Sequence, residues 1–169
     1  DRLENACHPT IAMIHGFCMG GGVAIALSCD MRYAADDASF AIPAARLGVA
    51  YPWPVLKKLV EIAGTAVARE LLFTARRFSV MEAEKRGLVN GVVPKAQLDA
   101  TVRAYAARIS ENAPLTIRAA KQTMKELAKG AGADLSFCDR LMSECFDSAD
   151  YEEGYRAFLE KRKPVFRGR

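Results

Sequence analysis

The sequence predicts an α/β core followed by a helical region, and three observations support this prediction. A short apolar run at 10–15 contains β-branched residues and ends at Gly16, as a buried strand does. The contiguous glycines Gly20–Gly22 then precede small and apolar residues at 23–29, which is typical of a buried helix. After Pro52, apolar residues recur at helical spacing almost to the end of the chain. Strand, tight turn, buried helix and strand in succession indicate an α/β core.

Further strands and a first long helix follow along the chain. Segments 30–35 and 39–42 have the composition of strands. Pro52 and Pro54 suit the first turn of a helix, because proline there loses no hydrogen bond. Gly64 is then expected to end this helix, since glycine readily adopts the conformation that follows a last helical turn.

One more helix and one more strand are expected before the helical region. Ser79 and Glu82, three residues apart, form a capping box, and Gly87 ends the helix that they open. A last short strand is expected at 89–93, closed by Pro94. We therefore divide the chain into a core at residues 1–94 and a helical region at residues 95–169.

The helical region carries four apolar stripes. Their members stand three or four residues apart, which places them on one face of each helix. The stripes are Leu98, Val102, Tyr105 and Ile109; Ile117, Ala120, Met124 and Leu127; Phe137, Leu141 and Cys145; and Tyr151, Tyr155, Phe158 and Leu159. One small core does not cover all four faces, so we expect the chain to assemble through them.

Composition excludes several classes of protein. Hydrophobic residues make up 51% and charged residues 26% of the 169, which is globular usage and argues against disorder. No apolar run approaches the roughly 20 residues of a membrane span, and no leader peptide is apparent. The five cysteines lack CxxC spacing, which favours a reduced, cytoplasmic chain without a metal site. The net charge is only +4, and the sequence has no stripe of basic residues interleaved with aromatic ones. Both observations argue against nucleic acid as a partner.

The end of the chain is basic, and the sequence leaves two interpretations open. The side chains are either solvated positions of a frayed end or contacts for phosphate groups. They are Lys161, Arg162, Lys163, Arg167 and Arg169.

The glycine turn is the strongest local signal of function. Contiguous glycines allow positive φ and leave N–H groups at a helix start, which suit a phosphate or a developing oxyanion. A P-loop requires a Lys-Ser or Lys-Thr pair after its glycines, and this chain has none there. The glycines are contiguous, so their spacing also differs from that of a dinucleotide-binding turn. Tight packing remains the alternative interpretation of Gly20–Gly22.

A series of short motifs runs through the whole chain. They are His-Pro-Thr-Ile-Ala-Met-Ile-His-Gly at 8–16, Met-Gly-Gly-Gly at 19–22, Cys-Asp at 29–30, Phe-Ala-Ile-Pro at 40–43, Leu-Gly at 47–48, Leu-Phe-Thr-Ala at 72–75, Ala83, Gly-Leu-Val at 87–89, Val-Val-Pro at 92–94, Ala-Pro-Leu at 113–115 and Phe-Leu-Glu-Lys-Arg at 158–162. Each motif alone is weak. In this order and spacing the series resembles the C-terminal two-thirds of the crotonase (enoyl-CoA hydratase/isomerase) superfamily.

This resemblance implies a fold and a ligand. It implies part of a ββα spiral core, followed by C-terminal helices that pack across a homotrimer or a dimer of trimers. It implies an acyl-CoA thioester as substrate, with no further cofactor, bound beside Gly20 with the Gly21 N–H as one oxyanion donor. The second donor maps to a family portion that precedes this chain. Phe158 and Lys161 map to the nucleotide end of CoA in a neighbouring subunit.

Two positions depart from the hydratase pattern. Hydratases carry one glutamate just after the glycine turn and one after the proline of the following strand, where this chain has Ala24 and Ala44. Hydration needs one group to activate water and a proton donor for the α-carbon, and a methyl group can do neither. We therefore classify the chain by family as an enoyl-CoA hydratase. We expect it to retain stabilisation of a thioester enolate and to hydrate its substrate weakly.

Tyr51 supports an alternative reaction, decarboxylation. Segment 47–51 resembles the branch that decarboxylates methylmalonyl-CoA, which carries a tyrosine at this position. Loss of CO₂ generates the enolate directly, without a carboxylate base. A packed aromatic is the simpler interpretation of Tyr51, and a non-catalytic protein that binds acyl-CoA or RNA is the third alternative.

Overall fold

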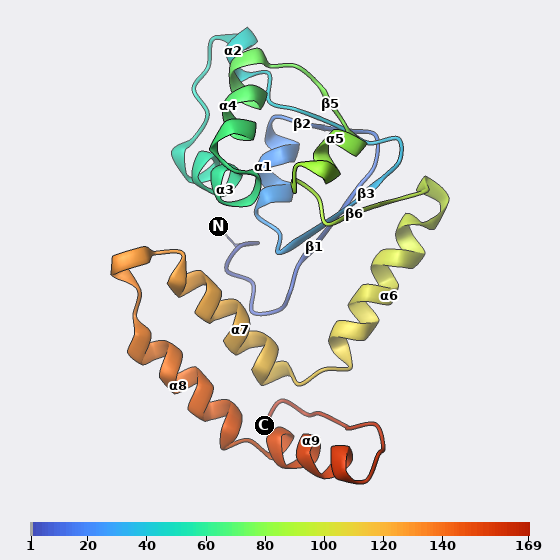
Figure 1. Cartoon of the computed structure of the whole chain (residues 1–169), viewed down its shortest axis with the longest axis vertical. Helices are drawn as coiled ribbons and strands as arrows, with labels where there is room; N and C mark the ends of the chain where they lie inside the picture. Colours follow the sequence, from blue (N-terminus) through green and yellow to red (C-terminus); the bar gives the residue numbers. More distant parts are fainter. Residues whose placement is uncertain (1) are drawn as a thin grey trace. The chain divides into compact units, whose positions relative to one another are not determined.

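The computed structural model describes residues 2–169, and these form two compact units. The first unit is the chain up to residue 103 without residues 7–9, and the second unit contains residues 7–9 and 104–169. The first holds the strands with short helices and the second is helical (Figure 1), so the α/β class with helices after it is confirmed. The division of the chain into domains at residue 94 stays a prediction.

Within residues 2–169 the strands form two three-stranded sheets. Sheet A has the order β1-β3-β6 and is parallel, whereas sheet B has the order β2-β4-β5 with β5 antiparallel to β4. The strands are β1 (Ile11–Ile14), β2 (Phe17–Met19), β3 (Met31–Ala35), β4 (Ser39–Ala41), β5 (Phe78–Ser79) and β6 (Gly91–Val93). Successive strands enter different sheets and a helix follows, which is the ββα pattern expected from the family resemblance (Figure 1).

The helices of the first unit begin and end at the residues that the sequence marks. Pro52 caps α3, Gly64 ends it, and the Ser79 side chain with Glu82 forms the capping box of α5. The helices are α1 (Gly21–Leu27), α2 (Ala44–Leu47), α3 (Trp53–Ala63), α4 (Thr65–Thr74) and α5 (Val80–Lys85). Local sequence signals therefore set these boundaries.

One core joins the sheets and helices of the first unit. Its largest fully buried side chains are Phe40, Phe78, Ile42, Leu59, Leu71 and Leu88. A smaller cluster on sheet A contains Tyr33, Ala35 and Leu98, the first residue of α6 (Leu98–Ser110). Both clusters lie within the unit that carries the glycine turn.

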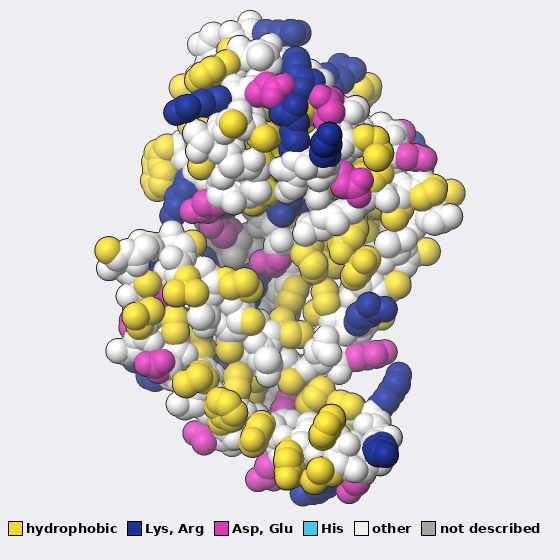
Figure 2. Space-filling model, viewed as in Figure 1, with side chains coloured by type: hydrophobic (Ala, Val, Ile, Leu, Met, Phe, Trp, Pro, Cys, Tyr) yellow, Lys and Arg dark blue, Asp and Glu magenta, His cyan; other side chains and the backbone are white. Residues whose placement is uncertain are grey.

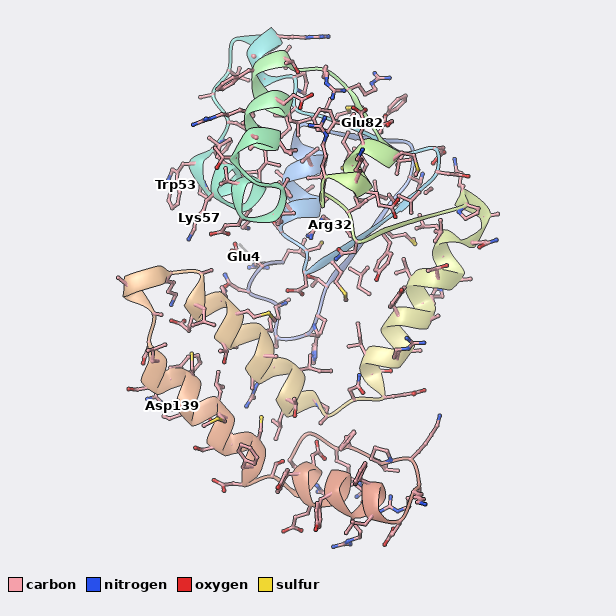
Figure 3. The ribbon with its side chains drawn as sticks, viewed as in Figure 1. Glu4, Arg32, Trp53, Lys57, Glu82 and Asp139 are labelled. Atoms are coloured by element: carbon pink, nitrogen blue, oxygen red, sulfur yellow. The ribbon has the colours of Figure 1, made fainter. Side chains whose placement is uncertain are left out.

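Arg32 is a buried cation in the interior of the first unit (Figure 3). Its Nε donates to the Leu88 carbonyl at 3.0 Å and its Nη1 to the Cys29 carbonyl at 2.9 Å. The Arg32 backbone N–H also donates to the Asn90 side chain at 2.8 Å. Burial lowers the pKa of the guanidinium. Arg32 therefore ties the end of α1 to the segment that leads into β6.

The second unit is built from helices. It contains most of α6, then α7 (Pro114–Leu127), α8 (Leu135–Phe146) and α9 (Ala149–Leu159). Short 3₁₀ turns lie at Lys95–Gln97, before α6, and at Gly130–Gly132, between α7 and α8. Helices α7 and α8 pack side by side (Figure 1). No helix within residues 2–169 is both long enough and apolar enough to span a membrane.

The chain after α9 folds back along this helix. The buried carboxylate of Asp150 accepts hydrogen bonds from the backbone N–H groups of Arg167 at 2.7 Å and Gly168 at 2.8 Å. Glu153 accepts from the Val165 N–H and pairs with Arg162. The frayed-end interpretation of this segment is therefore wrong, because specific carboxylates hold it in place.

Candidate functional site

The glycine turn joins β2 to α1 and has a conformation that favours glycine. Gly20 has φ 47° and ψ −110°, where a side chain would strain the backbone. Its N–H donates to the carbonyl of Ala41 at 2.8 Å, which fastens the turn to the end of β4. A Cβ atom placed on Gly21 would meet no atom within 4 Å, so the backbone of Gly21 borders open space.

Tyr51 reaches this turn from the loop before α3. Its hydroxyl donates to the Gly20 carbonyl oxygen at 2.6 Å, and its ring packs against the main core. The backbone N–H of Ala24 donates to the same Gly20 oxygen at 3.2 Å. The fold therefore brings together four of the predicted site positions, namely Gly20, Gly21, Ala24 and Tyr51.

Two ionisable side chains next to the turn, Tyr51 and Cys18, are neutral at neutral pH. Burial raises the pKa of the Tyr51 phenol above its ordinary value, and the nearby Cys18 acts in the same direction. Burial also raises the pKa of the Cys18 thiol to about 11. The phenol therefore stays protonated and keeps its hydrogen-bond donor.

The two alanines lie where acid–base residues were expected from the hydratase pattern. Ala24 is in α1 and is half-buried, whereas Ala44 is the first residue of α2 and is part of the main core. The acids that flank this part of the chain have structural partners: Asp30 accepts from the Thr10 N–H at 2.6 Å, and Asp37 pairs with Lys95. The chain has no carboxylate between Asp37 and Glu61.

Phe158 and Lys161 lie in the second unit. The Phe158 side chain is 80% exposed in the last turn of α9, and Lys161 follows that helix with a positive φ of 53°. Lys161 is exposed as well, so both side chains are accessible. Their predicted contact with the nucleotide end of CoA stays a prediction.

An apolar groove lies between α7, α8 and α9. Its volume is about 720 Å³, and it contains none of the residues of the glycine turn. Figure 2 shows apolar side chains at the surface over these helices. Among the lining side chains are Met124, Met142, Phe146, Tyr151, Tyr155 and Phe158. Apolar surface of this kind is typical of interaction sites, and the expected assembly through these helices stays a prediction.

Two contributors to the site carry no recognisable signal in the sequence. Ala41 anchors Gly20 through its carbonyl, and Cys18 lies beneath the turn with its Sγ 3.9 Å from a Cβ placed on Gly22. The pairing of β2 with β4 brings both residues to the turn. Within residues 2–169, no three His, Cys, Asp or Glu side chains gather in a way that could hold a metal ion.

Comparison with known proteins assigns the chain to one family. The profile of the family described as enoyl-CoA hydratase/isomerase matches residues 1–169. A short-chain-enoyl-CoA hydratase from Clostridium acetobutylicum is 37% identical over 166 residues, which cover 96% of this chain and 62% of that protein. A mitochondrial Delta(3,5)-Delta(2,4)-dienoyl-CoA isomerase from Dictyostelium discoideum is 34% identical, with 99% of this chain and 58% of that protein covered.

Solved structures agree with this assignment. The crystal structure of an enoyl-CoA hydratase/isomerase family protein from Hyphomonas neptunium matches with a TM-score of 0.94 and 34% sequence identity. The match covers 99% of this chain and 64% of that one. The chain thus spans about three-fifths of the length of the relatives it matches.

Proposed function

Because the chain belongs to the enoyl-CoA hydratase/isomerase family of the crotonase superfamily, we propose that it acts on an acyl-CoA thioester through a stabilised enolate. The observation that carries this proposal is the turn at Gly20 and Gly21. Gly21 is the exposed first residue of α1, so its N–H is one of those that a helix leaves without an intrahelical partner, and it can donate to a thioester oxygen as charge develops on it. The CoA thioester is the substrate, and no further cofactor or metal is proposed.

By family, the protein is classed as an enoyl-CoA hydratase with weak hydration. Ala24 and Ala44 stand where hydratases carry their glutamates, and neither methyl group can move a proton. Tyr51 does not replace them as a base, because its raised pKa keeps it protonated at neutral pH. Removing a general acid or base typically costs about 10² to 10⁴ in rate. Stabilisation of the enolate without efficient hydration is the expected behaviour.

Decarboxylation of a malonyl-type thioester is the second candidate. The position of Tyr51 beside the turn supports it, since the hydroxyl would reach a substrate carboxylate there by exchanging its hydrogen bond to the Gly20 oxygen. Loss of CO₂ leaves the electron pair on the α-carbon as the enolate, so this reaction needs no carboxylate base. A protein that binds acyl-CoA without turnover is the third candidate.

We also propose that the helical unit mediates self-assembly into a homotrimer or a dimer of trimers. The exposed apolar side chains of the groove support this, among them Met142, Phe146 and Tyr155. Neither a nucleic acid nor a membrane is a proposed partner. We expect the protein in a reducing, cytoplasmic setting, in keeping with cysteines that are free throughout residues 2–169.

Turnover of crotonyl-CoA and methylmalonyl-CoA by the purified protein, beside binding of both thioesters, separates the three candidates. We expect binding of both with slow hydration of crotonyl-CoA. Faster decarboxylation of methylmalonyl-CoA, lost in Tyr51→Phe, would favour the second candidate. Binding without any turnover would favour the third, and absence of binding would contradict the proposal.

A further inference from the structure

One peptide group carries both contacts that matter at the glycine turn. The carbonyl of Gly20 and the N–H of Gly21 belong to the same planar unit and point in opposite directions. The carbonyl end accepts the Tyr51 hydroxyl at 2.6 Å, and the N–H end is the donor of the proposed function. Tyr51 is therefore connected to the thioester site through a single rigid group.

We propose that Tyr51 is a positioning residue, which orients and polarises the Gly20–Gly21 peptide so that its N–H donates to the thioester oxygen. This inference rests on the proposed function, because it takes the Gly21 N–H as the donor. It differs from the decarboxylase alternative, in which the Tyr51 phenol contacts the substrate itself.

The turn needs an external anchor because glycine does not fix its own backbone. Gly20 to Gly22 place three residues without side chains in a row, and such residues readily visit other conformations. The Gly20 N–H is held by Ala41 at 2.8 Å, on the peptide group that precedes Gly20. On the following peptide group, the Tyr51 contact at 2.6 Å is shorter than that of the Ala24 N–H at 3.2 Å.

The hydrogen bond from Tyr51 to the Gly20 oxygen also makes the Gly21 N–H a stronger donor. A hydrogen bond accepted by an amide oxygen draws electron density from the nitrogen, so the N–H on the other side becomes a better donor. The Tyr51 hydroxyl is suited to this because it is half-buried and reaches the turn from a loop that Pro52 ends at the start of α3. It also retains its proton, since burial raises its pKa.

The geometry favours this role over direct contact with substrate. A phenol has one proton to donate, and here that proton is directed to the Gly20 oxygen. To donate to a substrate carboxylate or an enolate, Tyr51 would have to give up this bond and leave the turn without its short contact. A positioning role for Tyr51 keeps its hydrogen bond to the Gly20 oxygen intact.

The test compares bound thioester carbonyls in wild type and Tyr51→Phe. Crotonyl-CoA labelled with ¹³C at the thioester carbonyl is bound to the purified protein, and its stretching band is recorded by difference infrared spectroscopy. In wild type we expect a shift to lower frequency, and in Tyr51→Phe a smaller shift with crotonyl-CoA binding retained. Slow hydration should fall about tenfold, which is less than the 10² to 10³ typical of losing an oxyanion donor itself.

Tyr33→Phe is the control, because it removes the hydroxyl of a second tyrosine of the same unit, one that lies outside the glycine turn. It should leave the carbonyl band unchanged. A fluorinated tyrosine at position 51, which is a stronger donor, should shift the band beyond wild type, and a merely structural role predicts no such effect.

The outcomes separate this inference from the proposed function. If wild type does not bind crotonyl-CoA or does not shift its carbonyl band, the proposed function fails and this inference fails with it. If wild type shifts the band and Tyr51→Phe shifts it equally, the inference alone is overturned. An unchanged band with turnover abolished in Tyr51→Phe would also overturn it, in favour of direct contact with substrate.

Discussion

The two units differ in whether they bury aromatic side chains. The first unit buries Tyr33, Phe40 and Phe78 although it also exposes Phe17, Trp53 and Phe73, whereas no aromatic side chain of residues 104–169 is buried. In the first unit Phe40 and Phe78 are 1% and 0% exposed, whereas in the second Phe146 and Phe158 are 58% and 80% exposed. The first unit fills its own core and thereby fixes the glycine turn. The second presents apolar surface, which we attribute to assembly.

The largest effect that sharpens this comparison is on stability. Phe40→Ala removes a buried ring from the first unit and should cost about 3 to 5 kcal/mol of unfolding free energy. Leu135→Ala, at a position 60% exposed at the start of α8 and outside both the apolar groove and the apolar stripes, should change it by less than about 0.5 kcal/mol. Urea unfolding of both variants measures the difference. Equal losses would mean that the second unit packs this apolar side chain as tightly as the first unit packs Phe40.

The next effect concerns the missing carboxylates of the first unit. Installing Ala24→Glu together with Ala44→Glu should raise crotonyl-CoA hydration by about 10² or more, because acid–base groups typically contribute at least that factor. The pair Ala24→Gln and Ala44→Gln is the control, with similar shape and no acid. Hydration assays and melting curves are run together, since Ala44 is buried. Equal rates in both pairs would contradict the account of the weak hydratase.

Assembly is the effect expected from the second unit. Met142→Asp places a charge in the apolar groove and should convert the assembled protein to a smaller species. Light scattering at micromolar concentration measures the mass, and Asp139→Asn, on the same helix but outside that groove, is the control (Figure 3). A wild-type monomer under these conditions would contradict the proposed assembly.

The smallest expected effect is a loss of stability in acid, to which both units contribute. Hydrogen bonds from Arg76 lower the pKa of Glu82 to about 2 in the first unit, and those from Arg162 lower the pKa of Glu153 to about 2 in the second. Both folded-state values lie below the ordinary 4.5. Each carboxylate therefore contributes stability above pH 4.5, and this contribution is lost as the pH falls towards 2.

Melting temperatures between pH 7 and pH 2 test this expectation. Glu82→Gln and Glu153→Gln should each flatten the acid decline, while both variants remain folded at neutral pH. A decline as steep as that of wild type in both variants would show that other groups set the acid sensitivity.

Much of the fold could be predicted because its signals are local. Pro52, Gly64 and the pair Ser79 and Glu82 act within one helical turn, and the structure confirms each of them. The glycine turn was likewise expected from three adjacent residues. Such features depend on backbone preferences that neighbouring residues satisfy.

The features that carry no local signal in the sequence depend on partners that are distant along the chain. Strand β2 has three residues and is defined by its pairing with β4, and its Phe17 is 75% exposed. Arg32 interrupts an apolar stretch in the sequence, yet its guanidinium is buried because it donates hydrogen bonds to backbone carbonyls up to 56 residues away. The contact from Tyr51 to Gly20 spans 31 residues. No local pattern reports such contacts.

The most direct test of the account is the rate of Gly21→Val with crotonyl-CoA. A Cβ at Gly21 meets no atom of the chain within 4 Å, so the variant should stay folded while its side chain occupies the space for the thioester oxygen. Gly132→Val, at a second glycine with open surroundings, is the control. We expect turnover to fall by about 10² to 10³ in Gly21→Val and to be unchanged in Gly132→Val. Near-native turnover by a folded Gly21→Val would contradict the assignment of Gly21 as the oxyanion donor.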